Sequence, residues 1–168
     1  MKTILAAALL LTLAVSAQAA PAAVCNDGGY HQFDFWLGEW DVFETSGGPR
    51  EARASITSVQ NGCGVHEAYR NDDGGGGGES LNTFDPHTGV WRQSWLSDKG
   101  QIAVMEGRKE GTSINIMGPE TGDAVGRIIR GSWTPIAGGA VHETADRSDD
   151  GGKTWKPWYD LTLRPHKN

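Results

Sequence analysis

The sequence is poor in cysteine and basic residues, and both shortages narrow the possible functions. Only two cysteines occur, Cys25 and Cys63, and they do not form a C-x-x-C pair. No two histidines have H-x-x-x-H spacing, which argues against a zinc site of the common types. The 15 basic residues are outnumbered by 21 acidic ones, giving a formal net charge of −6. This charge argues against nucleic acid or anionic lipid as a partner.

Long helical patterns and familiar catalytic motifs are also missing. After the leader, no stretch of twelve residues keeps a clean helical period without a Gly or Pro. No G-x-S-x-G motif or other arrangement typical of a nucleophile and its base is visible. The glycine run 74–78 is followed by Glu79-Ser80, not by the Lys-Ser/Thr of a phosphate-binding loop. We therefore expect a flexible loop tip there and no nucleotide site.

Residues 1–19 have the layout of a secretory signal peptide. Lys2 supplies the positive charge, residues 4–15 form an apolar run too short to span a bilayer comfortably, and Ala17-Gln18-Ala19 is an A-x-A cleavage signal. We predict cleavage near Ala19-Ala20 and a periplasmic or secreted protein; an uncleaved anchor is the alternative. No later apolar stretch approaches spanning length, so we expect no membrane insertion of the mature chain.

Export would place the two cysteines in an oxidising compartment. A disulfide between Cys25 and Cys63 is then the natural expectation, because only one pairing is possible. It would tie the N-terminal arm, residues 20–32, to the rest of the domain and contribute about 2–4 kcal/mol to stability. The competing interpretation is a pair of buried thiols.

The remainder, residues 33–168, shows short segments of alternating polarity separated by glycine-rich turns. Such a pattern predicts an all-β domain, and short hairpins throughout favour an antiparallel up-and-down meander that closes into a barrel. A short helix is expected near residues 30–35, as a cap on the barrel. About ten strands are predicted, at 36–45, 51–59, 64–71, 80–85, 90–98, 101–109, 112–117, 125–134, 140–147 and 155–164.

The aromatic-rich segment HQFDFWLGEWDV, residues 31–42, leads into the first predicted strand. Gly38 precedes Trp40 in a G-x-W pattern, where the glycine permits close approach and the tryptophan fills the floor of a small barrel. Arg164, near the end of the last strand, is expected to stack on Trp40 as a cation–π pair. We assign all three residues a structural role.

Several motifs together resemble those of a group of secreted bacterial domains of unknown function, which are similar to the calycin (lipocalin-like) barrels. The resemblance spans nearly the whole mature chain. It implies the barrel fold and no particular function, since a fold does not determine function. The matching stretches are F-D-F-W-x-G-x-W-D at 33–41, N-G-C-x-x-x-E at 61–67, S-L-N-x-[FY]-D-P-x-T-G-x-W-R-Q-x-W at 80–95, R-x-x-x-x-x-W-T-P at 127–135 and S-D-D-G-G-K-T-W at 148–155.

The stretch 148–155 also matches the Asp-box of sialidase propellers. A propeller repeats the box in every blade, whereas this chain has one copy and is too short for that fold. We therefore predict a structural turn, in which the Asp150 carboxylate accepts backbone N–H groups and Trp155 packs beneath.

The barrel interior offers the most specific functional hypothesis. Alternation places Glu67, Gln93 and Arg127 on the same side of their strands as large aromatics. A buried carboxylate needs a partner, so Glu67 is expected to face Arg127 with Gln93 nearby. This composition is typical of a pocket for a small, largely apolar molecule. The predicted ligand-binding residues are Glu67, Tyr69, Trp91, Gln93, Trp95, Arg127 and Trp133.

Three alternatives remain open from the sequence. The same residues could form a self-satisfied network in a filled core, leaving a purely structural module. Glu67 could act as the base of a hydrolase or isomerase, and Glu143 is a possible acid–base partner that nothing in the sequence brings close. Haem could bind through His142, although its alternation with Thr144 and Asp146 favours the outer face. No cofactor or metal is otherwise predicted, and the oligomeric state stays unknown.

Overall fold

Alternating side chains and tight glycine turns produce a chain of β-hairpins. The computed structural model describes residues 25–121 and 126–167, so the predicted leader lies outside the described residues. The strands are β1 (Gly38–Glu44), β2 (Arg50–Val59), β3 (Gly64–Asn71), β4 (Gly77–Asp85), β5 (Val90–Ser97), β6 (Ile102–Glu110), β7 (Ser113–Thr121), β8 (Arg127–Ile136), β9 (Ala140–Ser148) and β10 (Lys156–Pro165).

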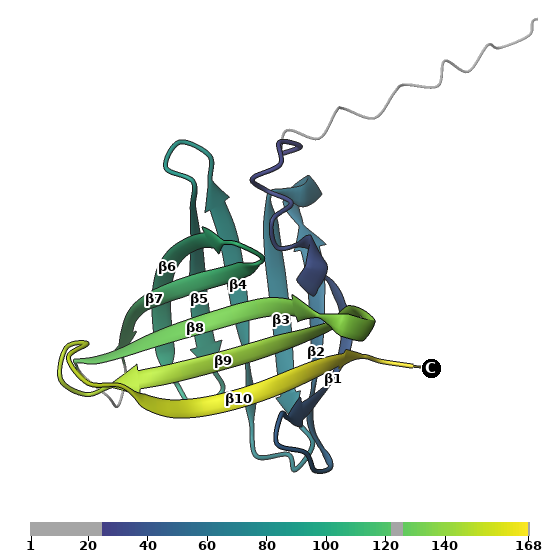
Figure 1. The fold of residues 1–168 in the computed structure, drawn as a ribbon, viewed down its shortest axis with the longest axis vertical. Coiled ribbons are helices and arrows are strands. Elements are labelled where there is room, and N and C mark those ends of the chain that lie inside the picture. The colour runs from purple at the N-terminus through teal and green to yellow at the C-terminus, as the bar shows by residue number, and fades with distance from the viewer. Residues whose placement is uncertain (1–24, 122–125, 168) are drawn as a thin grey trace, which may run out of the picture.

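Each strand pairs antiparallel with its neighbours in sequence, and β1 pairs with β10 to close the sheet. Figure 1 shows the resulting barrel, in which the first and last strands lie side by side. The predicted all-β, ten-stranded up-and-down barrel is confirmed. Among the ten described strands, closure leaves no unpaired sheet edge, which a meander of short strands would otherwise expose.

Strand boundaries differ most from the prediction where glycine interrupts the pattern. β4 begins at Gly77, inside the glycine run, and β7 continues through Gly118-Pro119 to Thr121. At Gly118 a Cβ atom would collide with the backbone of Val104, so the glycine permits close approach of β6 and β7. Gly118 therefore lies within β7, although the sequence prediction ended this strand at residue 117 because a glycine follows.

An aromatic plug fills one end of the barrel. It comes from the N-terminal arm and the one-turn helix η1 (Asp34–Trp36). The short helix expected near residues 30–35 thus begins slightly later in the chain. Phe33 and Trp36 are fully buried, and the Phe33 ring lies 5.1 Å from that of Trp91 and 5.8 Å from that of Trp133. Trp40 completes the floor by donating a 2.8 Å hydrogen bond from Nε1 to the Trp36 carbonyl.

A disulfide fastens the arm that carries the plug. Cys25 and Cys63 are joined by an S–S bond of 2.02 Å, which confirms the predicted pairing and excludes two free thiols. Cys63 follows the turn η2 (Gln60–Gly62) between β2 and β3. The bond therefore attaches the arm to the barrel rim at the plugged end.

Arg164 does not stack on Trp40 as expected. Its guanidinium lies 4.5 Å from the ring centroid of Phe43, and the residue is paired with Asp41 in the β1–β10 register. Trp40 is buried inside the barrel, whereas Arg164 is exposed. The two residues lie on opposite faces of the sheet, because neighbouring positions alternate between faces. Gly38 adopts a φ of +145°, which favours glycine.

The Asp-box stretch forms the turn between β9 and β10. The Asp150 carboxylate accepts N–H groups from Lys153 at 3.0 Å and Thr154 at 2.9 Å. Trp155 donates from Nε1 to the Gly152 carbonyl at 3.1 Å. Hydrogen bonds from Thr154 and Ser148 hold the pKa of Asp150 well below its usual range. These contacts describe a self-contained turn at the end of the barrel opposite the plug.

Candidate ligand cavity

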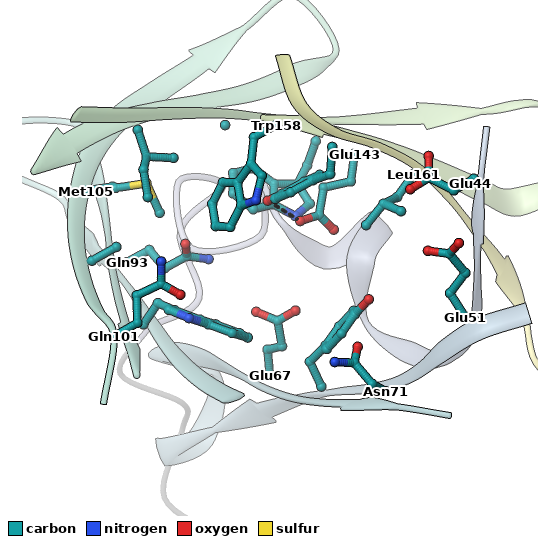
Figure 2. A pocket seen from close by; sticks show the side chains of 17 residues that line it. Glu44, Glu51, Glu67, Asn71, Gln93, Gln101, Met105, Glu143, Trp158 and Leu161 are labelled. Atoms are coloured by element: carbon teal, nitrogen blue, oxygen red, sulfur yellow. Dashed lines mark hydrogen bonds between the residues drawn. The ribbon is translucent and has the colours of Figure 1, made fainter. Parts of the chain in front are cut away.

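A cavity of about 340 Å³ lies inside the barrel between the plug and the opposite end. Figure 2 shows the side chains that point into this space from strands all around the barrel. The interior is therefore not packed solid, contrary to the filled-core alternative. The lining residues are Glu44, Glu51, Glu67, Tyr69, Asn71, Gln93, Trp95, Gln101, Ala103, Met105, Ile129, Gly131, Trp133, Glu143, Trp158, Tyr159 and Leu161.

Five of the seven predicted ligand-binding residues line this cavity. Glu67 and Tyr69 come from β3, Gln93 and Trp95 from β5, and Trp133 from β8. Alternation explains their shared direction, because residues two apart on a strand project to the same face. Glu67 is only 5% exposed, although its carboxylate lies beside open space.

A chain of hydrogen bonds holds one oxygen of Glu67. Gln93 donates from Nε2 to Asn82 Oδ1 at 3.0 Å, and Asn82 donates from Nδ2 to Ser80 Oγ at 3.0 Å. Ser80 then donates to Glu67 Oε2 at 2.8 Å. Sequence reasoning missed Ser80 and Asn82, although the alternation of the 80–85 strand placed both on one face. The chain fixes the orientation of the carboxylate without neutralising its charge.

Glu143 is a second buried carboxylate in the same cavity. It is 8% exposed and comes from β9, across the barrel from Glu67. Tyr159 of β10 donates a 3.0 Å hydrogen bond from its hydroxyl to Glu143 Oε1. The structure thus brings together two carboxyls that the sequence gave no reason to associate.

The two carboxyls take up protons unusually readily. Burial raises the pKa of Glu67 to about 8, with a further contribution from the nearby charge of Glu143 and an opposing one from the Ser80 hydrogen bond. Burial likewise raises the pKa of Glu143 to about 7, against the Tyr159 hydrogen bond. The Trp133 indole N–H also lowers the pKa of Glu143. It does so without a hydrogen bond, because the buried Nε1 has no hydrogen-bond partner among the described residues.

Arg127 does not meet Glu67, which corrects the predicted polar trio. Its guanidinium lies 2.9 Å from Asp149 and 3.4 Å from the buried Glu120, at the end of the barrel away from the plug. The register connects the two positions through the row Glu67, Ser80, Trp95, Ala103, Glu120 and Arg127. Barrel strands are tilted, so following such a row also moves along the barrel axis. Alternation correctly predicted on which face of the sheet Arg127 lies, but it could not predict the position of Arg127 along the barrel axis.

Trp91 belongs to the plug and not to the cavity. It is buried against Phe33 and Phe84, and its Nε1 donates a 3.1 Å hydrogen bond to Gln32 Oε1. The residue lies two positions from Gln93 on β5, towards the plugged end. It therefore supports the cavity floor, and its predicted place in a ligand-binding wall is wrong.

His142 lies on the outer face of β9, so haem ligation inside the barrel through this residue is wrong. Its Nε2 is 2.7 Å from Asp160 Oδ1. The side chain does not line the cavity. Across residues 25–121 and 126–167, no group of three or more His, Cys, Asp or Glu side chains is arranged to hold a metal ion.

Neither a comparison with protein-family models nor one with curated proteins found a match for this chain. Within the part of the chain that the structure describes, none of the helices has the length and apolar character needed to cross a membrane. Function must therefore be inferred from the cavity itself.

Proposed function

We propose that this chain is an exported, lipocalin-like binding protein that holds one small molecule with an apolar body inside its barrel. The observation that carries this proposal is the 340 Å³ cavity, walled by aromatic and aliphatic side chains. Its size falls within the range of cavities that take small ligands, and such sites combine apolar walls with a few placed polar groups. The Gln93–Asn82–Ser80–Glu67 chain supplies the placed polar groups.

The ends of the barrel support this proposal. The disulfide and the buried aromatic plug give the cavity a rigid floor, whereas Glu44, Glu51 and Trp158 line it towards the opposite end. A pre-formed space with a fixed floor binds a ligand without the cost of ordering its walls. The disulfide and the predicted signal peptide both agree with a periplasmic or extracellular location.

Titration with a neutral hydrophobic fluorophore, N-phenyl-1-naphthylamine, tests the proposal. We expect saturable binding with quenching of tryptophan fluorescence, because Trp95 and Trp133 line the cavity. Ala103→Phe should abolish binding by filling the space, since Ala103 lines it. Val104→Phe is the matched control, because Val104 lies on the same strand and is exposed. Equal binding to both variants, with both folded, would place the dye elsewhere and reject the proposal.

Proton-transfer catalysis is a second candidate, favoured by the raised pKa values of Glu67 and Glu143 beside open space. A hydrolase or isomerase would use Glu67 as its base. A screen of ester and enolisable carbonyl substrates, run with wild type and Glu67→Gln, tests this candidate. Turnover that disappears in Glu67→Gln would support it, and turnover unchanged in that variant would exclude this role for Glu67.

A further inference from the structure

The polar groups of the cavity are strongly biased towards negative charge. Its lining includes four carboxylic acids, Glu44, Glu51, Glu67 and Glu143. Among the described residues that line it, none is Lys, Arg or His. The other lining polar groups are amides, tyrosine hydroxyls and indole N–H groups, none of which carries a compensating positive charge.

The two buried acids are also unusual within this barrel, because a third buried acid has cationic partners. Glu120 is 1% exposed and lies 2.9 Å from Arg147 and 3.4 Å from Arg127. Glu67 and Glu143 are almost as buried, but no described Lys, Arg or His lies within ion-pair distance of either. An unpaired charge is costly to bury, so these two acids hold protons more tightly than usual, and a cation from outside the chain would stabilise their ionised forms.

Each buried acid keeps one oxygen available to the cavity. Glu67 uses Oε2 to accept from Ser80, and Glu143 uses Oε1 to accept from Tyr159. No described residue donates a hydrogen bond to Glu67 Oε1 or Glu143 Oε2, and Figure 2 shows both carboxyl groups directed into the space. An ammonium group has three donors and no acceptor, which matches these free acceptors.

The aromatic walls favour the same chemistry. Tyr69 and Trp95 pack edge to face with ring centroids 6.4 Å apart, and Trp133, Trp158 and Tyr159 line the same cavity. The face of an aromatic ring carries negative potential and attracts organic cations. Acids and ring faces together distinguish this cavity from a purely apolar one.

We infer that the ligand is a small organic cation, a protonated amine with an apolar body, whose ammonium group lies between Glu67 and Glu143 while the aromatic walls enclose the rest. This inference rests on the proposed binding function and specifies its ligand class. An anionic ligand would face four acids, and a neutral apolar one would leave the buried carboxyls unpaired.

Binding of such a ligand is linked to protons. The other titratable side chains that line the cavity are Glu44 from β1, Glu51 from β2, Tyr69 from β3 and Tyr159 from β10. Both tyrosines have raised pKa values and stay neutral, and the acids only strengthen the negative potential. At neutral pH the Glu67–Glu143 pair retains a proton, which an ammonium ion must displace.

Isothermal titration calorimetry with three matched probes tests the inference. Phenethylamine, 2-phenylethanol and phenylacetate share a phenyl ring and differ in charge. At pH 8.5 we expect the amine to bind at least tenfold more tightly than the alcohol and the acetate to bind worst. Amine affinity should fall at least tenfold at pH 6, and buffers of different ionisation enthalpy should reveal proton release on binding.

Charge-neutral variants locate the effect. Glu67→Gln and Glu143→Gln should each weaken amine binding at least tenfold, so that the preference for the amine over the alcohol is lost. Glu79→Gln is the control, because Glu79 lies on the neighbouring strand outside the barrel and pairs with Arg70. That variant removes the same charge and should keep the wild-type affinity within twofold.

Two results would overturn the inference. If the alcohol binds as tightly as the amine, the cavity does not select cations, although the general binding function stands. If no amine binding is measurable while the neutral fluorophore still binds, the ligand class is again wrong. Loss of fluorophore binding as well would reject the proposed function together with the inference.

Discussion

The hydroxyl of Ser80 donates a 2.8 Å hydrogen bond to Glu67 Oε2, and this contact joins β4 to a buried carboxylate with no cationic partner among the described residues. The bond opposes the effect of burial on Glu67, because it stabilises the ionised form. Ser80 therefore positions the carboxylate and helps to set its proton affinity.

Replacing Ser80 by alanine tests this relationship. We expect Ser80→Ala to raise the pKa of Glu67 above about 8, since a hydrogen bond to the charged form is lost. The stability loss should be about 1–3 kcal/mol, because buried partners are left unsatisfied. Carbon-13 NMR titration of the Glu67 carboxyl measures the shift. An unchanged or lower pKa would show that the hydroxyl does not serve the carboxylate.

The stability of the folded protein should fall as the pH rises. Glu67 has a folded-state pKa of about 8 against a usual value of 4.5, so the folded protein holds a proton that the unfolded chain has lost. The contribution of Glu67 to the free energy of unfolding is therefore greatest below pH 4.5 and is lost as the pH rises through about 8. Glu143, with a pKa of about 7, acts in the same direction.

Urea denaturation between pH 5 and 9 measures this slope. Wild-type stability should fall by a few kcal/mol over that range, in order of magnitude, and Glu67→Gln should flatten the profile. Glu79→Gln is the control, since hydrogen bonds from Arg70 and His66 lower the pKa of Glu79 and move its titration to acid pH. A Glu67→Gln profile parallel to that of wild type would contradict the assignment.

Two buried glutamates should respond in opposite ways to neutralisation. Glu120→Gln should destabilise the fold by roughly 3–5 kcal/mol, because Arg147 and Arg127 lose the charge that they share. Glu67→Gln at pH 9 should be neutral or stabilising, because it removes a buried charge without a partner. Chemical denaturation of both variants at pH 9 gives the comparison. Equal losses of stability in the two variants would mean that the charge of Glu67 has a compensating partner.

Removal of the Cys25–Cys63 bond should loosen the plugged end. The bond spans 38 residues, for which the loop-entropy relation gives about 4 kcal/mol of stabilisation at 25 °C. The double variant Cys25→Ser/Cys63→Ser should show that loss in chemical denaturation and should still bind the fluorophore when folded, because neither cysteine lines the cavity. Wild-type stability in the double variant would show that the arm is held mainly by its aromatic contacts.

Much of this fold could be predicted from local sequence. Period-two alternation and glycine turns located the strands, because a strand's faces and a turn's backbone angles depend on nearby residues. The pairing of Cys25 with Cys63 followed from having only two cysteines. Alternation also gave the inward direction of Glu67, Gln93 and Trp95, all of which line the cavity.

Tertiary structure decided which inward residues meet. The tilt of the strands carries Arg127 to the barrel end, where it joins Glu120, and brings Glu143 to the cavity opposite Glu67. The depth of the plug places Trp91 in the floor and leaves space above it. Alternation reports a face and contains no information on height along the barrel axis. Only closure of the sheet around the plug determined that the interior is hollow and lined by acids.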